Sequence, residues 1–173
     1  MPTNYHIEYI RREAIDTSQW DRCIEDSANS LIYAHSFYLD NMAKNWDALI
    51  LNNYEAIMPL TWNQKWGMKY LYQPPLTQQL GIFSRKSIGD EVRKAFINEA
   101  TKHYRFAEIY FNYFNNDPGC KPCNNYILSL NTNYEDLQNA YAADLIKNLK
   151  RSSRFELHYR KENDLTLALK LHE

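Results

Sequence analysis

The sequence predicts a mixed α/β (α+β) fold in which a mainly antiparallel sheet is flanked by helices. Segments with the two-residue period of strands alternate with segments in which apolar residues recur every three or four positions, as on helices. Two apolar, ring-rich runs, residues 46–51 and 54–62, stand so close together that an antiparallel meander is their simplest arrangement. The chain is 45% hydrophobic and 24% charged, the balance of a folded water-soluble protein, so one domain is expected over residues 1–173.

The first part of the chain predicts one strand and two helices. Apolar and polar residues alternate over residues 5–9, as in a half-buried strand. Asp16 or Thr17 can cap a following helix, and Ser36 can cap a shorter one that ends at Met42. The apolar face of the first helix is formed by Trp20, Cys23 and Ile24.

The central part predicts the meander and a loop. Asn52 and Asn53 join the two ring-rich runs and tolerate the positive φ of a tight turn. A second turn near residues 65–67 leads into a strand over residues 68–72. Residues 73–81 include two adjacent prolines, which lack amide donors, so we expect an ordered loop there.

Beyond the loop, a helix and a strand are expected. Ser87 can cap the helix, and residues 106–112 follow as a strand. Residues 115–123 are polar and predict a turn region. The helix is indicated by apolar residues at helical spacing: Ile88, Val92, Ala95, Phe96 and Ala100.

The last part predicts a strand over residues 126–130, a long helix and a final strand over residues 155–159. Thr132 and Glu135 have the spacing of a capping box at the start of the helix. Residues 165–171 fit a strand or a short helix, of which we favour the helix. The stripe of the long helix consists of Tyr134, Leu137, Tyr141, Leu145 and Leu149.

Composition excludes several classes of function. The net charge of −1 provides no field that would attract a nucleic-acid backbone, so no DNA partner is expected. No stretch approaches the ~20 apolar residues of a membrane span, and residues 1–12 lack the unbroken apolar stretch of a signal peptide. Three cysteines, an odd number, do not build a disulfide framework. We therefore expect a cytoplasmic protein.

Two runs carry a resemblance to a known family: LIYAHSFYLDNMAKNWDALI at residues 31–50 and YEAIMPLTWNQKWGMKYLYQPPLTQQLGIFS at residues 54–84. They resemble the GNAT-like proteins related to the Fem-type aminoacyl/acyltransferases, and residues 72–81 are the most distinctive part. The basic segment at residues 147–151 is similar to a further element of that family. The resemblance implies a GNAT-like domain corresponding to the first half of a two-domain Fem-type protein.

This resemblance implies acyl or aminoacyl transfer to an amine. The donor would be an aminoacyl-tRNA or acetyl-CoA or another acyl-coenzyme A, with no cofactor bound tightly, and the acceptor a small molecule or a peptidoglycan-precursor-like molecule. Catalysis would require a second GNAT-like half or a homodimer partner. Two alternatives remain: a self-sufficient acetyl-CoA-dependent N-acetyltransferase, and a non-catalytic binding or interaction module of the same fold.

The resemblance also implies binding residues, although it names no catalytic residue. Lys44, together with basic residues near the end of a later helix, would neutralise a diphosphate, since Arg binds phosphate through paired hydrogen bonds and Lys as a point charge. Loop glutamines would complete the acceptor cleft. The substrate-binding candidates are Lys44, Trp46, Gln73, Gln78, Gln79, Lys147 and Arg151.

Gln78 and Gly81 have the spacing of the GNAT loop that holds the coenzyme A pyrophosphate on backbone amides at a helix start. Phe83, however, stands where a small residue is expected, and several residues separate Gly81 from the expected helix start at Ser87. We therefore favour a packed loop held by glutamine amides, with coenzyme A binding as the alternative.

Two other groups of residues could in principle bind a metal or take part in catalysis. Cys120 and Cys123 form a C-x-x-C, which can hold one side of a zinc site or form a redox pair, but the sequence offers no second ligand pair. Loop thiols and no metal are therefore expected. His35 beside Ser36 suggests a base and a nucleophile, and Glu55 or Glu108 could serve as a base, but no oriented partner is evident for any of them.

Overall fold

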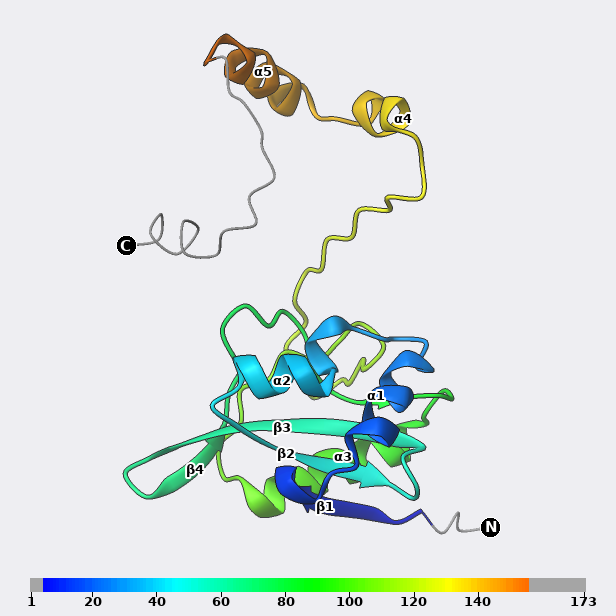
Figure 1. The fold of residues 1–173 in the computed structure, drawn as a ribbon, viewed down its shortest axis with the longest axis vertical. Helices are drawn as coiled ribbons and strands as arrows, with labels where there is room; N and C mark the ends of the chain where they lie inside the picture. Colours follow the sequence, from blue (N-terminus) through cyan, green and yellow to red (C-terminus); the bar gives the residue numbers. More distant parts are fainter. Residues whose placement is uncertain (1–4, 156–173) are drawn as a thin grey trace. The chain divides into compact units, whose positions relative to one another are not determined.

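A computed structural model of the chain describes residues 5–155. Contacts between residues divide the chain into two compact units, Met1–Asn125 and Tyr126–Glu173, and the sheet and its core belong to the first (Figure 1). The single domain expected over residues 1–173 stays a prediction. Within residues 5–155 no helix combines the length and the apolar character needed to cross a bilayer.

The first unit contains an antiparallel sheet of five strands. Four neighbouring strands follow the order β1-β2-β3-β4, and the fifth, β5, pairs with the start of β3. The mixed α+β fold with a mainly antiparallel sheet flanked by helices is thereby confirmed. The strands are β1 (Ile7–Arg11), β2 (Asn45–Leu51), β3 (Ala56–Lys65), β4 (Met68–Leu71) and β5 (Phe83–Ser84).

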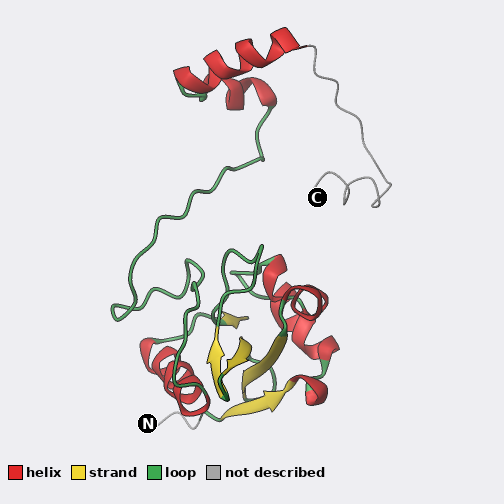
Figure 2. Cartoon of the chain, turned by 90° about the vertical axis from the view of Figure 1, so that its left-hand side faces the viewer, coloured by secondary structure: helices red, strands yellow, loops and turns green. Residues whose placement is uncertain are grey.

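Helices cover both faces of the sheet. Helices α1 (Thr17–Glu25) and α2 (Ser36–Met42) lie on one face, and α3 (Asp90–His103) lies on the other (Figure 1). Figure 2, turned by 90°, shows the strands between these layers. Short 3-10 turns over Arg12–Ala14 and Ile32–Ala34 connect the first elements.

Strand β2 is buried on both faces because it lies between the two helical layers. Its alternate residues Trp46, Ala48 and Ile50 join the cluster beneath α1 and α2, whereas Leu49 and Leu51 join the cluster beneath α3. This alternation follows from the two-residue period of a strand. The expected face of α1 is confirmed, since Trp20, Cys23 and Ile24 are buried.

The sheet accommodates a proline in β3. Pro59 pairs with Ala48 of β2, but its other side falls in a gap, because β5 covers only residues 56–57 and β4 only residues 62–65. Thr61, two residues further on, accepts from the Tyr72 amide (N to O, 3.0 Å) on that same side. The missing N–H of Pro59 therefore faces a place where no strand requires it.

Both predicted hairpins are present. The β2–β3 turn uses residues 52–55, with φ of 50° at Asn52 and 57° at Tyr54, so β3 begins two residues later than the apolar run suggested. The β3–β4 turn has two central residues, Trp66 (φ 50°) and Gly67 (φ 78°). Positive φ at both central positions gives a type I′ turn.

The cap of α1 is Asp16 and not Thr17. Its carboxylate accepts from the amides of Ser18 (3.0 Å) and Gln19 (3.1 Å) and from the Gln19 side chain (3.0 Å). These bonds, led by the Gln19 side chain, lower the pKa of Asp16. The capping contribution is thus complete above the ordinary pKa of aspartate and is lost as the pH falls through the lowered value.

We expect Asp16→Ala to lower the melting temperature by roughly 2–4 °C at neutral pH, because two amides at the helix start lose their acceptor. Thr17→Ala is the matched control and should change it little. The difference between Asp16→Ala and the natural protein should fade in acid. Thermal unfolding followed by circular dichroism checks this, and an equal effect of Thr17→Ala would contradict the assignment.

The two serine caps were wrong. Helix α3 begins at Asp90 after Gly89, two residues later than a cap at Ser87 suggested, and acidic residues in its first turn complement the dipole. The residue before α2 is His35, without a side-chain cap, and the Ser36 hydroxyl donates instead to Asp21 (2.6 Å). For Ser36, the bond to Asp21 outweighs the local capping preference.

Residues 106–112 are extended but do not form the predicted strand. One isolated parallel bridge joins Ala107 to Leu71 of β4, and a second joins Phe111 to Leu80 near the end of the loop. Residues 73–79 between these contacts form the predicted loop. Because residues 73–79 leave the extended path between the two bridges, residues 107–111 form no continuous ladder of hydrogen bonds with residues 71–80.

The second unit differs most from expectation. The strand predicted over residues 126–130 is wrong: these residues have no regular structure, and Tyr126 is 87% exposed. Alternating apolar residues do not make a strand without a neighbour to pair with. The described elements are α4 (Tyr134–Asn139), α5 (Ala143–Ser152) and a 3-10 turn at Ser153–Phe155.

The single long helix predicted there is likewise wrong, since residues 140–142 separate α4 from α5. The helix cap is Asn133, whose side chain accepts from the Asp136 amide (2.9 Å), and not Thr132. Phe155 ends a 3-10 turn. The rest of the predicted strand at 155–159 and the helix at 165–171 lie outside the described residues.

Candidate functional site

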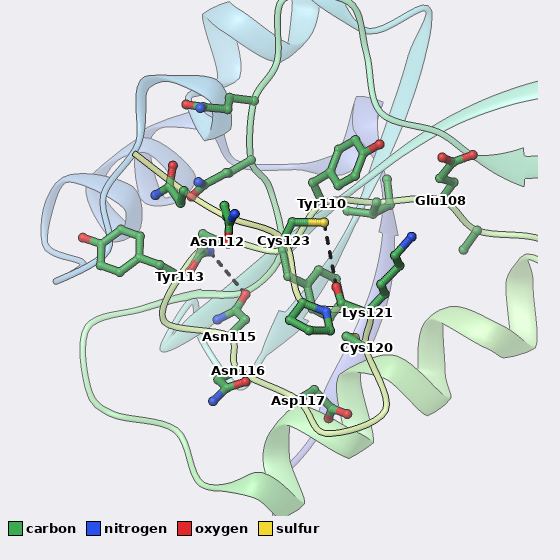
Figure 3. Close-up of a pocket in the computed structure, with 18 residues that line it drawn as sticks. Glu108, Tyr110, Asn112, Tyr113, Asn115, Asn116, Asp117, Cys120, Lys121 and Cys123 are labelled. Atoms are coloured by element: carbon green, nitrogen blue, oxygen red, sulfur yellow. Dashed lines mark hydrogen bonds between the residues drawn. The ribbon is translucent and has the colours of Figure 1, made fainter. Parts of the chain in front are cut away.

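A cavity of about 810 Å³ lies in the first unit (Figure 3). Its walls come from three parts of the chain: the end of the 73–81 loop, the extended residues 107–113, and the polar turn region that follows. None of these is a long helix or strand. The shape of the cavity therefore depends on side-chain bonds that hold the loops in place.

The side chain of Gln73 makes two such bonds. Its side-chain carbonyl accepts from the Tyr110 amide (3.1 Å), and its side-chain amide donates to the carbonyl of Thr77 (2.9 Å). Backbone bonds between Leu80 and the extended segment continue the attachment, from the Leu80 amide to Tyr110 (2.8 Å) and from the Asn112 amide to Leu80 (2.8 Å). The Gln73 side chain thus attaches the loop to the extended segment.

A buried cluster of three asparagines, Asn29, Asn112 and Asn115, holds the floor of this region. The Asn115 side chain accepts from the Ile82 amide (2.6 Å) and donates to the Ile82 carbonyl (3.0 Å). Asn29 donates to the same carbonyl (2.9 Å) and to the Asn112 side chain (3.1 Å). Sequence reasoning missed this cluster, because isolated asparagines in polar segments give no sign of a shared buried partner.

The cavity lining is rich in amides and carries few charges. Glu108, Tyr110 and Lys121 lie towards one end and Tyr113 towards the other (Figure 3). Asp117 is already engaged, since it accepts from the Gly119 amide (2.8 Å) and lies 3.9 Å from the Arg93 guanidinium. Within residues 5–155 no side-chain hydrogen bond or ion pair engages the carboxylate of Glu108, which is thus the anionic group free to meet a ligand.

The two loop thiols also line the cavity. Cys120 and Cys123 are both free and exposed. Desolvation by the loop, and then the negative charge of Asp117, raise the pKa of Cys120, which disfavours its thiolate. Over residues 5–155 no three His, Cys, Asp or Glu side chains gather closely enough to hold a metal ion.

The structure brings two of the predicted binding residues to this cavity, Gln78 and Gln79. Lys44 is exposed after α2, and its backbone amide donates to the Tyr72 hydroxyl (2.8 Å). Trp46 is only 3% exposed, and its indole N–H donates to Asp40 (2.8 Å). The ring of Trp46 is therefore part of the core.

Two backbone amides in and directly after the Gln78-to-Gly81 segment already have partners within the fold. The Leu80 amide donates to Tyr110 and the Ile82 amide to Asn115. Phe83 is fully buried, and α3 starts only at Asp90. Coenzyme A binding through Gln78 and Gly81 stays a prediction to which this geometry adds no support.

Lys147 and Arg151 lie on α5 in the second unit. Lys44 belongs to the first unit, so a diphosphate site that combines it with Lys147 and Arg151 stays a prediction. Helix α5 carries its basic residues in the last turn, where positive charge favours the dipole.

His35 and Ser36 do have a partner, Asp21, which sequence reasoning missed. The Ser36 hydroxyl donates to one carboxylate oxygen (2.6 Å), and the other lies 3.5 Å from His35 Nδ1. The serine thus bonds to the carboxylate and not to the imidazole, so no base removes its proton. Glu55 accepts from the Asn52 side chain (3.1 Å) in the hairpin turn.

Comparison of the chain with known protein families, characterised proteins and solved structures gives no match.

Proposed function

We propose that the first unit is a GNAT/Fem-like acyltransferase-family domain and that its cavity forms part of the acceptor cleft for acyl or aminoacyl transfer to an amine. The observation that supports this most is the free carboxylate of Glu108 at the end of an amide-lined cavity of about 810 Å³. This volume lies within the range of ligand sites, roughly 300–1,000 Å³. Amide side chains suit a polar acceptor such as a peptide or sugar, because each offers both a donor and an acceptor.

Glu108 gives the proposal a chemical role. An amine acceptor is cationic in water and is attracted by a carboxylate. To react, the ammonium first gives one proton to water. The neutral nitrogen then bonds to the carbonyl carbon of an ester or thioester donor, the C–O or C–S bond breaks, the leaving alkoxide or thiolate takes up a proton from solvent, and a second proton leaves the nitrogen. Glu108 is the group in the cavity that can accept this proton.

The rest of the reaction is assigned to a second GNAT-like half. The amides of Leu80 and Ile82 are already engaged within the fold, so they do not serve the donor. Backbone donors for the developing oxyanion would come from that second half or from a partner. The proposal is therefore an acceptor-side domain that is incomplete alone.

The test compares an acceptor with and without its amine. A nucleotide-sugar diphosphate bearing a peptide with a free amine, and the same molecule acetylated on that amine, are titrated by calorimetry. We expect the free amine to bind more tightly to the natural protein, by about ten-fold for one charge-assisted bond. Glu108→Gln should remove most of that difference.

Glu25→Gln is the matched control, since Glu25 is exposed at the end of α1, outside the cavity. It should leave the discrimination unchanged. Equal binding of the two ligands by the natural protein would overturn the role of Glu108. Binding of acetyl-CoA alone would favour a self-sufficient N-acetyltransferase, and binding of neither class would favour an interaction module.

A further inference from the structure

The β3–β4 hairpin carries the most exposed large apolar side chain among the described residues 5–125. Trp66, at the tip, is 86% exposed, and Met68 beside it is 60% exposed. Figure 1 shows this hairpin projecting beyond the helices that cover the rest of the sheet. Its apolar tip is thus presented outward and not packed in the core.

The turn itself is unfavourable for tryptophan. Trp66 has a φ of 50° at the first central position of a type I′ turn, where Asn, Asp or Gly is preferred. Positive φ is costly for a bulky side chain. Trp66 lowers the stability of the turn and is hardly packed against the rest of the protein, which indicates that it serves to bind a partner.

The same hairpin also contains a buried polar group without a hydrogen-bond partner, which is uncommon in folded proteins. The buried indole nitrogen of Trp62 has no hydrogen-bond partner, and the Lys69 ammonium lies 3.9 Å from the centre of a Trp62 ring. At the tip, the Lys65 ammonium lies 4.7 Å from the centre of a Trp66 ring. Each lysine thus places its charge beside an aromatic ring on the projecting hairpin.

The hairpin residues 62–71 carry charge of one sign, from Lys65 and Lys69. No Asp or Glu occurs between Glu55 and Asp90, whereas that segment contains four basic residues, two of them on the hairpin. A partner for this surface must therefore offer negative charge and accept apolar side chains at the same place. An anionic phospholipid surface has both properties, since Trp and Met enter the interfacial region while lysines meet the headgroups.

A single-stranded nucleic acid fits the hairpin less well. Stacked bases need successive ring faces, but Tyr70 meets both Tyr72 and Phe106 edge-to-face, at interplanar angles of 62° and 67°. The exposed neighbour of Trp66 is Met68, which has no ring. The net charge of −1 also gives no long basic track for a phosphate backbone.

We propose that the hairpin formed by residues 62–71 is a membrane-docking element that inserts Trp66 and Met68 into the interface of an anionic lipid surface, with Lys65 and Lys69 contacting the headgroups. The docking is peripheral and reversible, because only one tip enters the lipid. This inference does not rest on the proposed acyltransferase function.

Vesicle co-sedimentation of the full chain tests the proposal. We expect binding to phosphatidylserine-containing vesicles, weak binding to phosphatidylcholine alone, and a decrease as salt is raised. Lys65→Gln and Lys69→Gln should each weaken binding by about five-fold. Trp66→Asn should weaken it by about ten-fold.

Trp66→Asn separates docking from folding because its two effects have opposite directions. Asparagine suits the turn, so the melting temperature should stay the same or rise by a few degrees while vesicle binding falls. Lys94→Gln and Phe37→Asn are matched controls, since both residues are exposed on helices away from the hairpin. Neither control should change vesicle binding.

Four results would overturn the proposal. These are absence of binding to anionic vesicles, equal losses in the control variants, preferential binding of a single-stranded oligonucleotide that Trp66→Asn abolishes, and a dimer in sedimentation that depends on Trp66. The last two would assign the tip to a nucleic acid or to a second copy of the chain.

Discussion

Gly81→Ala is expected to destabilise the first unit by about 3 kcal/mol, the sum of backbone strain and disrupted buried hydrogen bonds. Gly81 has a φ of 103°, a region that other residues avoid. A Cβ there would overlap the side-chain oxygen of Asn115 and lie 3.2 Å from the Phe111 ring. Asn115 cannot move away freely, because it holds both the amide and the carbonyl of Ile82.

Two other glycines are internal controls for this prediction, which chemical denaturation checks. Gly67 also has positive φ (78°) but open space around it, so Gly67→Ala should cost only about 1 kcal/mol. Gly89 has neither constraint, and Gly89→Ala should be nearly neutral. Equal losses at Gly81 and Gly67 would mean that the asparagine cluster yields to the extra methyl group.

Asp47→Ala is expected to cost about 3 kcal/mol, because it removes a buried acceptor shared by three donors. The carboxylate of Asp47 accepts from the hydroxyls of Tyr9 and Tyr104 (3.2 Å for Tyr104) and from the Arg12 amide (3.1 Å). Burial, followed by the bond to Tyr9, raises the pKa of Tyr104 far above its ordinary value, so its hydroxyl stays protonated and donates. Alanine would leave these donors without their acceptor.

Single tyrosine variants show how the acceptor is shared. Tyr9→Phe should cost only about 1 kcal/mol, since Asp47 keeps two donors. Urea unfolding of Tyr9→Phe and Asp47→Ala, measured side by side, checks the ratio. A loss below about 1 kcal/mol for Asp47→Ala would mean that the desolvation of a buried carboxylate offsets its hydrogen bonds.

Elements with a complete local signal were predicted from the sequence. The cap before α1 and the turn at residues 65–67 depend on neighbouring side chains and on backbone preference, both of which are visible in the sequence. The central meander could also be predicted, because each of its strands pairs with the next strand in the sequence. The two-sided burial of β2 likewise agrees with its mainly apolar run, which Asp47 alone interrupts between Trp46 and Leu51.

Elements that depend on distant partners were not predicted. Residues 126–130 have a strand pattern but no strand beside them. Ser36 would cap α2 on local grounds, yet its hydroxyl is engaged by Asp21, fifteen positions away. A single sequence does not show which of two available partners a polar side chain will meet.

The candidate site was predicted only in part. Gln78 and Gln79 line the cavity, whereas the bonds that hold the loop come from the side chain of Gln73. Trp46 was chosen for its place in a motif, whereas the structure uses it in the core. Glu108 was recognised as a carboxylate in the sequence. Its place in a cavity depends on residues 78–79 meeting residues 107–125 although α3 lies between them in the chain, and no local pattern reveals such a contact.

The position of the asparagine cluster has a consequence for how the protein is made. Neighbouring strands of the meander can pair in order of synthesis, but one face of the sheet stays open until α3 leaves the ribosome. The hydrogen bonds of the asparagine cluster to Ile82 form only when Asn112 and Asn115 emerge from the ribosome. Among the described residues, every buried side chain precedes position 116. The nascent chain can therefore complete its core while Tyr126–Glu173 is still being translated or passing through the exit tunnel.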